Sequence, residues 1–274
     1  MPQPSDEGPS LHASPVYLAG PAASTPALRP LLDAGFRREA DAKGNVHLTS
    51  LGGHQHVDYM PNGLTHALWQ ISGQSPDRYT PPTWQATFTT GTPPEVVAAI
   101  TTALTQKASP WPGGRRPRAD DVLRPLADAG WRRRENEWEI EFTSPDRLAT
   151  VLCDTTPGHP LDPEYEPWLI SGGRTLGYGY EWYAAFTTHT PPHLVTVTAA
   201  RLADPAPVPR TDTAVLHAEA TLHEAAGRST TPANSPRASA ALRRTSTTAP
   251  ARGTGSQPSP EPIQAAASRP GLRR

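Results

Sequence analysis

The 274-residue chain contains the same eleven-residue motif twice, and this repeat constrains the fold more than any other feature. The first copy reads WQATFTTGTPP and begins at Trp84. The second reads WYAAFTTHTPP and begins at Trp182, with eight of the eleven positions identical. Internal similarity at a fixed spacing is typical of duplicated structural units. The sequence therefore predicts two copies of one unit.

The similarity extends well beyond this motif. Two further pairs of segments match: LRPLLDAGFRRE (from Leu28) with LRPLADAGWRRR (from Leu123), and WQISG (from Trp69) with WLISG (from Trp168). The spacings of 95, 99 and 98 residues differ slightly, as expected if loops of unequal length join equivalent elements. We expect repeat 1 at residues 14–107, a linker at 108–122 and repeat 2 at 123–205.

In each repeat, the sequence predicts a short helix, four strands of an antiparallel sheet and a second helix. Gly35 and Gly130 are placed to end the first helices in a left-handed cap. In the last strand Trp84, Ala86 and Phe88 alternate with polar residues, which places the large side chains on one face. Short links between consecutive strands favour an antiparallel meander, so the fold class is α+β.

The start of the second helix is marked by the TPP segment. Thr92 is expected to cap the helix, with Pro93 at its first position and Glu95 completing a capping box. His193 replaces the glutamate in repeat 2, which predicts a weaker cap there.

Each predicted sheet has one helix to cover one of its faces, which leaves the second face open. This open face predicts how the two repeats pack together. We expect the two repeats to pack against each other with pseudo-two-fold symmetry. In that arrangement paired tryptophan–phenylalanine ridges shelter the apolar sides of both sheets.

The ends of the chain differ in character from the repeats. Residues 206–228 contain TAVLHAEATLHEAAGR, which predicts one more helix. Residues 1–13 and 229–274 have too few large apolar side chains to offset their ordering entropy, so we expect both to be disordered. The net charge is −2 over residues 1–107, −4 over 108–205 and +5 over 206–274, which makes the tail basic.

Secretion and membrane insertion are not indicated. Cys153 is the single cysteine, the N-terminus lacks a signal peptide, and no run of about 18 apolar residues is present. We expect a cytoplasmic protein that does not bind a membrane.

Several separated motifs resemble one actinobacterial family. SPVYLAGP at residues 14–21, then PLLDAGF, then the doubled W-x-A-x-F-T-T-x-T-P-P strand are similar to the domain of unknown function numbered 317. The resemblance covers roughly residues 14–205. It implies two tandem copies in a cytoplasmic actinobacterial protein, and it implies no activity and no functional residue.

No motif predicts catalytic, cofactor-binding or metal-binding residues. His54 and His56 form an H-x-H pair, but a zinc site needs at least a third ligand. Cys153 lies in a predicted strand and is expected to be a buried structural thiol. The glycines at residues 172–179 lack the spacing of a phosphate loop.

Arginines beside an aromatic residue are the candidate nucleic-acid contacts. Phe36 and Trp131 are each followed by arginines, which could hold a phosphate backbone while the ring stacks on a base. The candidates, with two from the tail, are Arg37, Arg38, Arg132, Arg133, Arg134, Arg243 and Arg244. Alternatively, the aromatics belong to the core and the second group of arginines pairs with Glu135 and Glu137.

Two classes of function follow. We expect a non-catalytic binding module, with a nucleic-acid platform aided by the basic tail as one form and a protein–protein interaction scaffold as the other. The partner is unknown in both cases. The second class is an enzyme with an unrecognised site, which is disfavoured because the two copies share no acid, base or nucleophile.

Overall fold

The computed structural model describes residues 11–73, 81–106, 117–156, 165–173, 181–210 and 219–224. Repeat 1 contributes α1 (Thr25–Asp33), β2 (Arg37–Ala40), β3 (Val46–Thr49), β4 (Gln55–Tyr59), β5 (Ala67–Gly73), β6 (Trp84–Thr89) and α2 (Pro94–Thr105). Repeat 2 contributes α4 (Arg124–Asp128), β7 (Arg132–Glu135), β8 (Glu139–Thr143), β9 (Ala149–Asp154), β10 (Trp168–Gly172), β11 (Trp182–Phe186) and α5 (Pro192–Ala203). The other elements are β1 (Leu11–Ser14), the 3-10 helix η1 (Val16–Leu18), α3 (Ala119–Val122), β12 (Val208–Arg210) and β13 (Thr221–Glu224).

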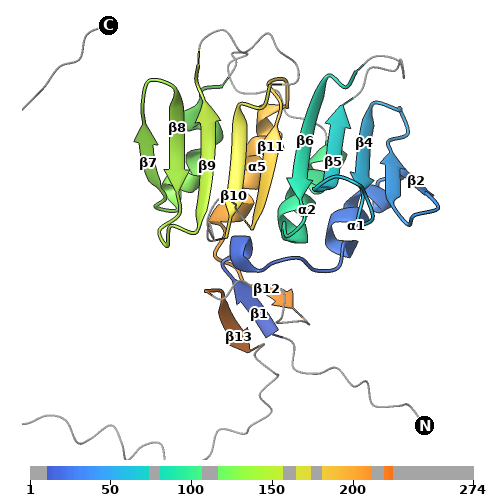
Figure 1. The fold of residues 1–274 in the computed structure, drawn as a ribbon, viewed down its shortest axis with the longest axis horizontal. Coiled ribbons are helices and arrows are strands. Elements are labelled where there is room, and N and C mark those ends of the chain that lie inside the picture. Colours follow the sequence, from blue (N-terminus) through green and yellow to red (C-terminus); the bar gives the residue numbers. More distant parts are fainter. Residues whose placement is uncertain are drawn as a thin grey trace, which may run out of the picture. The chain divides into compact units, whose positions relative to one another are not determined.

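Ten strands form one antiparallel sheet in the order β2-β3-β4-β5-β6-β11-β10-β9-β8-β7 (Figure 1). Five strands come from each repeat, so the prediction of four was wrong. The missed strands are β2 and β7, the two outer strands of the sheet. Their side chains are all exposed and mostly charged, and so they lack the alternating apolar pattern by which a strand is recognised.

The two repeats join edge to edge, not face to face as expected. β6 pairs with β11, and the two five-stranded halves become one continuous sheet. This pairing satisfies the backbone N–H and C=O groups that both strands would otherwise leave unpaired at an edge. The apolar side of the sheet is covered by helices instead of by a second sheet.

The repeated motif builds this junction. Phe88 pairs with Ala184 and Phe186 pairs with Ala86, so each phenylalanine faces the alanine of the other copy. The two rings meet edge to face, with centroids 5.7 Å apart.

The threonines of the motif add a matching pair of hydrogen bonds. The Gln85 N–H donates to Thr187 Oγ1 and the Tyr183 N–H donates to Thr89 Oγ1, both at 2.8 Å. Gln85 and Tyr183 are equivalent positions of the motif, as are Thr89 and Thr187. Each of these two hydrogen bonds across the junction therefore has its counterpart in the other copy.

The helices form a row in which α1 contacts α2, α2 contacts α5 and α5 contacts α4. Their buried side chains share one core with alternate residues of the strands. The largest fully buried side chains include Trp69, Phe88, Phe142 and Phe186. Trp182 is 2% exposed and Trp84 is partly buried, so both tryptophans belong to this core. Within the described residues no helix has the length and apolar character needed to cross a membrane.

Three boundaries predicted from sequence need correction. β1 begins at Leu11, so residues 11–13 are ordered in a strand. The predicted linker contains helix α3. Part of the predicted extra helix is β13, which pairs with β1 in a small sheet of order β12-β1-β13. Pairing with a distant strand overrides the local helical pattern at residues 221–224. Residues 1–10 and 225–274 lie outside the described ranges.

Glu95 does not complete a capping box. The residue before α2 is Pro93, which makes no side-chain cap, and Thr92 Oγ1 donates to the Thr89 carbonyl instead. The Glu95 carboxylate accepts two hydrogen bonds from Arg210, at 2.7 and 2.8 Å. The buried Arg210 also donates to the Ala19 carbonyl at 2.8 Å. This ion pair ties β12 and the N-terminal segment to α2.

Two equivalent glycines allow tryptophans to lie against the sheet, which gives a first testable prediction. A Cβ on Gly172 would lie 2.5 Å from the indole of Trp182, and one on Gly73 would lie 2.0 Å from that of Trp84. We expect Gly172→Ala to lower the free energy of unfolding by about 1–3 kcal/mol, because the buried Trp182 cannot move. Gly73→Ala should cost less, because the partly exposed Trp84 can shift. Urea denaturation of both variants checks this, and a larger cost for Gly73→Ala would contradict it.

Candidate functional site

The candidate site is the face of the ten-stranded sheet that is opposite to the helices, which we call the open face. Directly paired residues of neighbouring strands share a face, so the strand register identifies its members. One row crosses all ten strands: Glu39, His47, Asp58, Gln70, Thr87, Ala185, Leu169, Leu152, Glu141 and Arg134. We call this set the central row.

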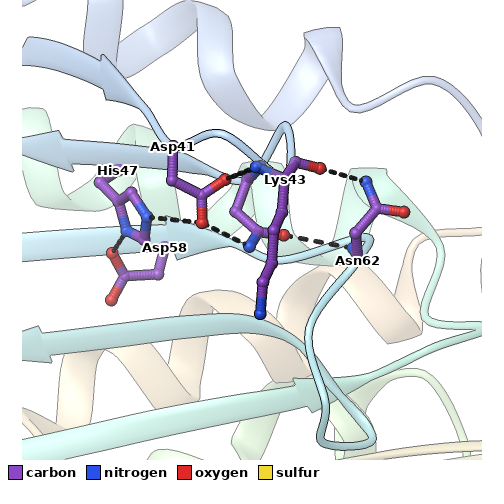
Figure 2. Close-up of polar contacts among 6 residues, drawn as sticks. Asp41, Lys43, His47, Asp58 and Asn62 are labelled. Atoms are coloured by element: carbon purple, nitrogen blue, oxygen red, sulfur yellow. Dashed lines mark hydrogen bonds and ion pairs between the residues drawn. The ribbon is translucent and has the colours of Figure 1, made fainter.

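The repeat 1 half of the central row is polar, and its centre is a histidine between two aspartates (Figure 2). His47 Nδ1 lies 2.7 Å from Asp58 Oδ1, and its Nε2 lies 3.9 Å from Asp41 Oδ2. β3 and β4 are joined by a short hairpin, which places His47 and Asp58 directly opposite each other. The side chain of His47 is 40% exposed, so the ring remains accessible from the open face.

Asp41 is held in place by the turn between β2 and β3. Its carboxylate accepts hydrogen bonds from the backbone N–H groups of Lys43 and Asn45, at 2.8 and 2.9 Å, and from the Asn45 side chain at 2.8 Å. The side-chain bond from Asn45 is the main cause that lowers the pKa of Asp41. Asn62 braces the turn through a 2.7 Å bond to the Lys43 carbonyl (Figure 2). Asp41 is therefore a fixed, ionised neighbour of His47.

Among the described residues, this cluster holds one part of a general-base arrangement and is not grouped as a metal site. A carboxylate that orients an imidazole is one part of a general-base arrangement, which also needs a nucleophile or an enclosed substrate. In repeat 2 the equivalents of His47 and Asp58 are Glu141 and Leu152, so the pair is not duplicated. Across the part of the chain that the structure describes, no three His, Cys, Asp or Glu side chains are grouped as a metal site.

The H-x-H pair lies apart from this cluster. His56 Nδ1 is 3.3 Å from Thr49 Oγ1, and its Nε2 is 3.1 Å from the Gly53 carbonyl oxygen. His54 is exposed in the turn before β4. The His56 ring therefore has a local role at the start of β4. Cys153 is buried in β9, as expected of a structural thiol.

In the repeat 2 half of the central row, the three residues nearest the junction are apolar. Ala185, Leu169 and Leu152 follow one another across β11, β10 and β9. Ala185 is buried, and both leucines are half-buried. Near this strip the Tyr165 hydroxyl donates to Asp154, and burial, followed by this carboxylate, raises the pKa of Tyr165 to about 12.

The predicted arginines do not form one site. Arg37 and Arg38 lie on β2, and Arg132, Arg133 and Arg134 lie on β7, at opposite edges of the sheet. Neighbouring strands lie about 4.8 Å apart, so the nine intervals from β2 to β7 separate the two groups by roughly 40 Å. Arg243 and Arg244 lie outside the described residues.

Two of these arginines, Arg133 and Arg37, have carboxylate partners. Arg133 Nε is 2.7 Å from Asp120 and its Nη2 is 2.7 Å from Glu135, which confirms the predicted pairing with Glu135. Hydrogen bonds to these two carboxylates, the Asp120 bond first, raise the pKa of Arg133. Arg37 Nε is 3.3 Å from Glu39.

The aromatics before these arginines belong to the core. Phe36 is 8% exposed and Trp131 is 6% exposed. Exposed charged side chains on an outer strand disfavour pairing with the edge of another sheet. In each repeat, the aromatic residue of this motif thus belongs to the core, and the arginines that follow it protect an outer strand from pairing with another sheet.

His47, Asp58 and the Arg210–Glu95 pair were not singled out by the sequence patterns. The polar positions of VHLT and QHVDY alternate with apolar ones, and counting outward from the turn would have paired His47 with Asp58. No local signal exists for Arg210, whose partner is 115 residues away.

Comparison with known proteins identifies one family. No curated protein and no solved structure matches the chain. The SPDY domain, described as a domain of unknown function (DUF317), matches residues 49–110 and 143–208. Each match begins in the middle of one repeat and extends beyond its second helix. The chain is therefore a member of the DUF317 family that carries two tandem copies of the domain.

Proposed function

We propose that this protein is a non-catalytic binding module whose open face binds another protein. The observation that supports this most directly is the apolar strip of Ala185, Leu169 and Leu152 near the middle of the central row. Charged and polar residues flank the strip on both sides. An apolar centre with a polar rim is the usual arrangement of a protein–protein interface.

The open face is large enough for such an interface. Strands about 4.8 Å apart and about five residues long, with a rise of about 3.4 Å per residue, give a face of roughly 700 Å². A standard interface buries about 800 Å² on each partner. A single partner could therefore cover most of the open face.

The charge of the open face favours a protein over a nucleic acid. Five carboxylates lie on it, those of Glu39, Asp58, Glu139, Glu141 and Asp154, against three arginines, Arg37, Arg132 and Arg134. A phosphate backbone is bound through an excess of positive charge, which this face lacks. Nucleic-acid binding through the basic tail remains the second candidate, because residues 206–274 carry a net charge of +5.

We further propose that the repeats are related by a pseudo-two-fold axis between β6 and β11. The reciprocal Phe88–Ala184 and Phe186–Ala86 pairs are what a two-fold axis requires, because each contact recurs with the roles exchanged. The central row departs from this symmetry: Asp58 and Gln70 occupy the positions that Leu152 and Leu169 occupy in repeat 2. Duplication would have built the wide face, and divergence would have given its halves different chemistry.

For the test, the purified protein is first used to capture a binding partner from an extract of the source organism. The captured partner is then purified. We expect Leu169→Lys to weaken its binding at least about tenfold, the effect of removing an interface anchor worth about 1.4 kcal/mol or more. Leu64→Lys is the matched control, because Leu64 is 95% exposed in the loop before β5 and is not a member of the central row. Isothermal titration calorimetry gives both affinities. Equal affinity for the two variants would contradict the proposal.

Nucleic-acid binding is measured separately, with labelled single- and double-stranded DNA at low and at physiological salt. Binding that weakens with salt and with removal of residues 206–274 would support the second candidate. Absence of binding at low salt would exclude it.

A further inference from the structure

The segment at residues 14–20 fills a cavity in repeat 2. The indole Nε1 of Trp182 donates to the Tyr17 carbonyl at 3.0 Å. The Tyr17 ring lies edge to face on Trp131, with centroids 5.8 Å apart, and its hydroxyl donates to Asp146 at 2.8 Å. Helix η1 contacts both α2 and α5. This part of the chain is therefore bound as a peptide would be, through one backbone carbonyl and one buried aromatic side chain.

Among the described residues, the equivalent place in repeat 1 is an open cavity of about 320 Å³. Gly73 and Trp84 line it, as Gly172 and Trp182 line the filled one. The other main lining residues are Gln55, Leu104, His193 and Leu194. Leu194 and His193 are the repeat 2 counterparts of Val96 and Glu95, so the two cavities are built from corresponding elements.

Side chains at the filled cavity are more buried than their counterparts at the open cavity, as expected if a bound segment covers them. Trp182 is 2% exposed, whereas Trp84 is only partly buried. Leu148 is 8% exposed, whereas its counterpart His54 is exposed. Within the described ranges, Trp84 Nε1 donates no hydrogen bond, although the equivalent atom of Trp182 binds a carbonyl. The open cavity thus retains the apolar wall and the donor of the filled one.

We propose that the Trp84 cavity is a peptide-binding site for a partner protein segment of the form Ser-Pro-x-aromatic. Trp84 Nε1 would bind a backbone carbonyl of this segment, and the aromatic side chain would enter the cavity. This site lies on the helix side of the sheet and does not depend on the function proposed for the open face.

The chemistry of the cavity also selects the aromatic residue. Gly52 occupies the position of Asp146, so a tyrosine hydroxyl would find no carboxylate there. Burial lowers the pKa of His193, which favours its neutral imidazole in the cavity. The site should therefore bind phenylalanine at least as well as tyrosine.

Two labelled synthetic peptides test the proposal on the full-length protein: SPVYLAG, the sequence of residues 14–20, and SPVFLAG. Fluorescence polarisation should give saturable binding of both, with SPVFLAG equal or tighter. Trp84→Phe should weaken binding roughly three- to tenfold, the value of one net hydrogen bond. Trp138→Phe should leave it unchanged, because Trp138 is 53% exposed in the turn between β7 and β8.

Three outcomes would overturn the proposal. The first is no binding at millimolar peptide, and the second is equal binding by the Trp84→Phe and Trp138→Phe variants. The third concerns residues 109–111, which lie outside the described ranges and read Ser-Pro-Trp, 95 residues after the Ser-Pro of residues 14–15. If the peptides bind only after residues 109–111 are replaced by Gly-Ser-Gly, the cavity serves the chain's own segment and not a partner.

Discussion

Replacing Phe186 by alanine is expected to lower the free energy of unfolding by about 3–5 kcal/mol. Phe186 is fully buried, and its ring packs edge to face on Phe88 of the other repeat. The substitution removes a large apolar side chain and leaves a cavity at the one place where both halves of the sheet meet. Urea denaturation followed by far-UV circular dichroism measures the change.

Tyr183→Ala is the matched control for Phe186→Ala. Tyr183 lies on the same strand but points to the open face, where it is 40% exposed. Its removal should cost less than about 1 kcal/mol, as is usual for exposed positions away from special contacts. Because one core spans both repeats, the wild-type protein should unfold in a single transition. Two transitions, or a loss below 1 kcal/mol for Phe186→Ala, would mean that the repeats are independent.

Replacing Arg210 by alanine is expected to cost about 3–5 kcal/mol, because it leaves the Glu95 carboxylate without its partner in a largely buried place. The Arg210 side chain is 1% exposed and that of Glu95 is 15% exposed. The same substitution also removes the hydrogen bonds that hold the carbonyls of Ala19 and Gly20. The N-terminal segment should then become more susceptible to proteolysis.

Arg133→Ala provides the comparison for Arg210→Ala. Arg133 also contacts two carboxylates, but its side chain is 35% exposed. Ion pairs that remain in contact with water contribute about 0–1 kcal/mol. In the double variant Arg210→Met, Glu95→Leu, much of the lost stability should return, because no unpaired charge remains buried. Equal losses for Arg133→Ala and Arg210→Ala would contradict the assigned role of burial.

Much of the architecture could be read from the sequence, because the signals for it are local or repeated. The motif from Trp84 and its copy from Trp182 predicted two equivalent units, and the period-two pattern placed Phe88 and Phe186 on the apolar face. For Phe36 and Trp131 the sequence left two alternatives, base stacking and a place in the core, and the structure places both in the core. The outer strands β2 and β7 were missed because four exposed, mostly charged residues have no apolar period.

Less of the candidate site could be predicted. The arginines were noticed because they recur beside aromatics, yet the sheet places them at opposite edges. The sequence predicted that the other repeat would cover the second face of each sheet, whereas edge-to-edge pairing leaves that face open. The central row on it depends on the register of ten strands, which no single segment specifies.

The sequence by itself determined which side chains share a face of each strand and helix, since that follows from the period of the local backbone. Only the tertiary structure decided that β6 pairs with β11, that Arg210 reaches Glu95, and that residues 14–20 fill one of two equivalent cavities. The local pattern could not decide how the repeats join, because pairing β6 with β11 and stacking the two sheets face to face would bury the same phenylalanines. The choice between them rests on hydrogen bonds across the β6–β11 junction, which join residues about 100 positions apart.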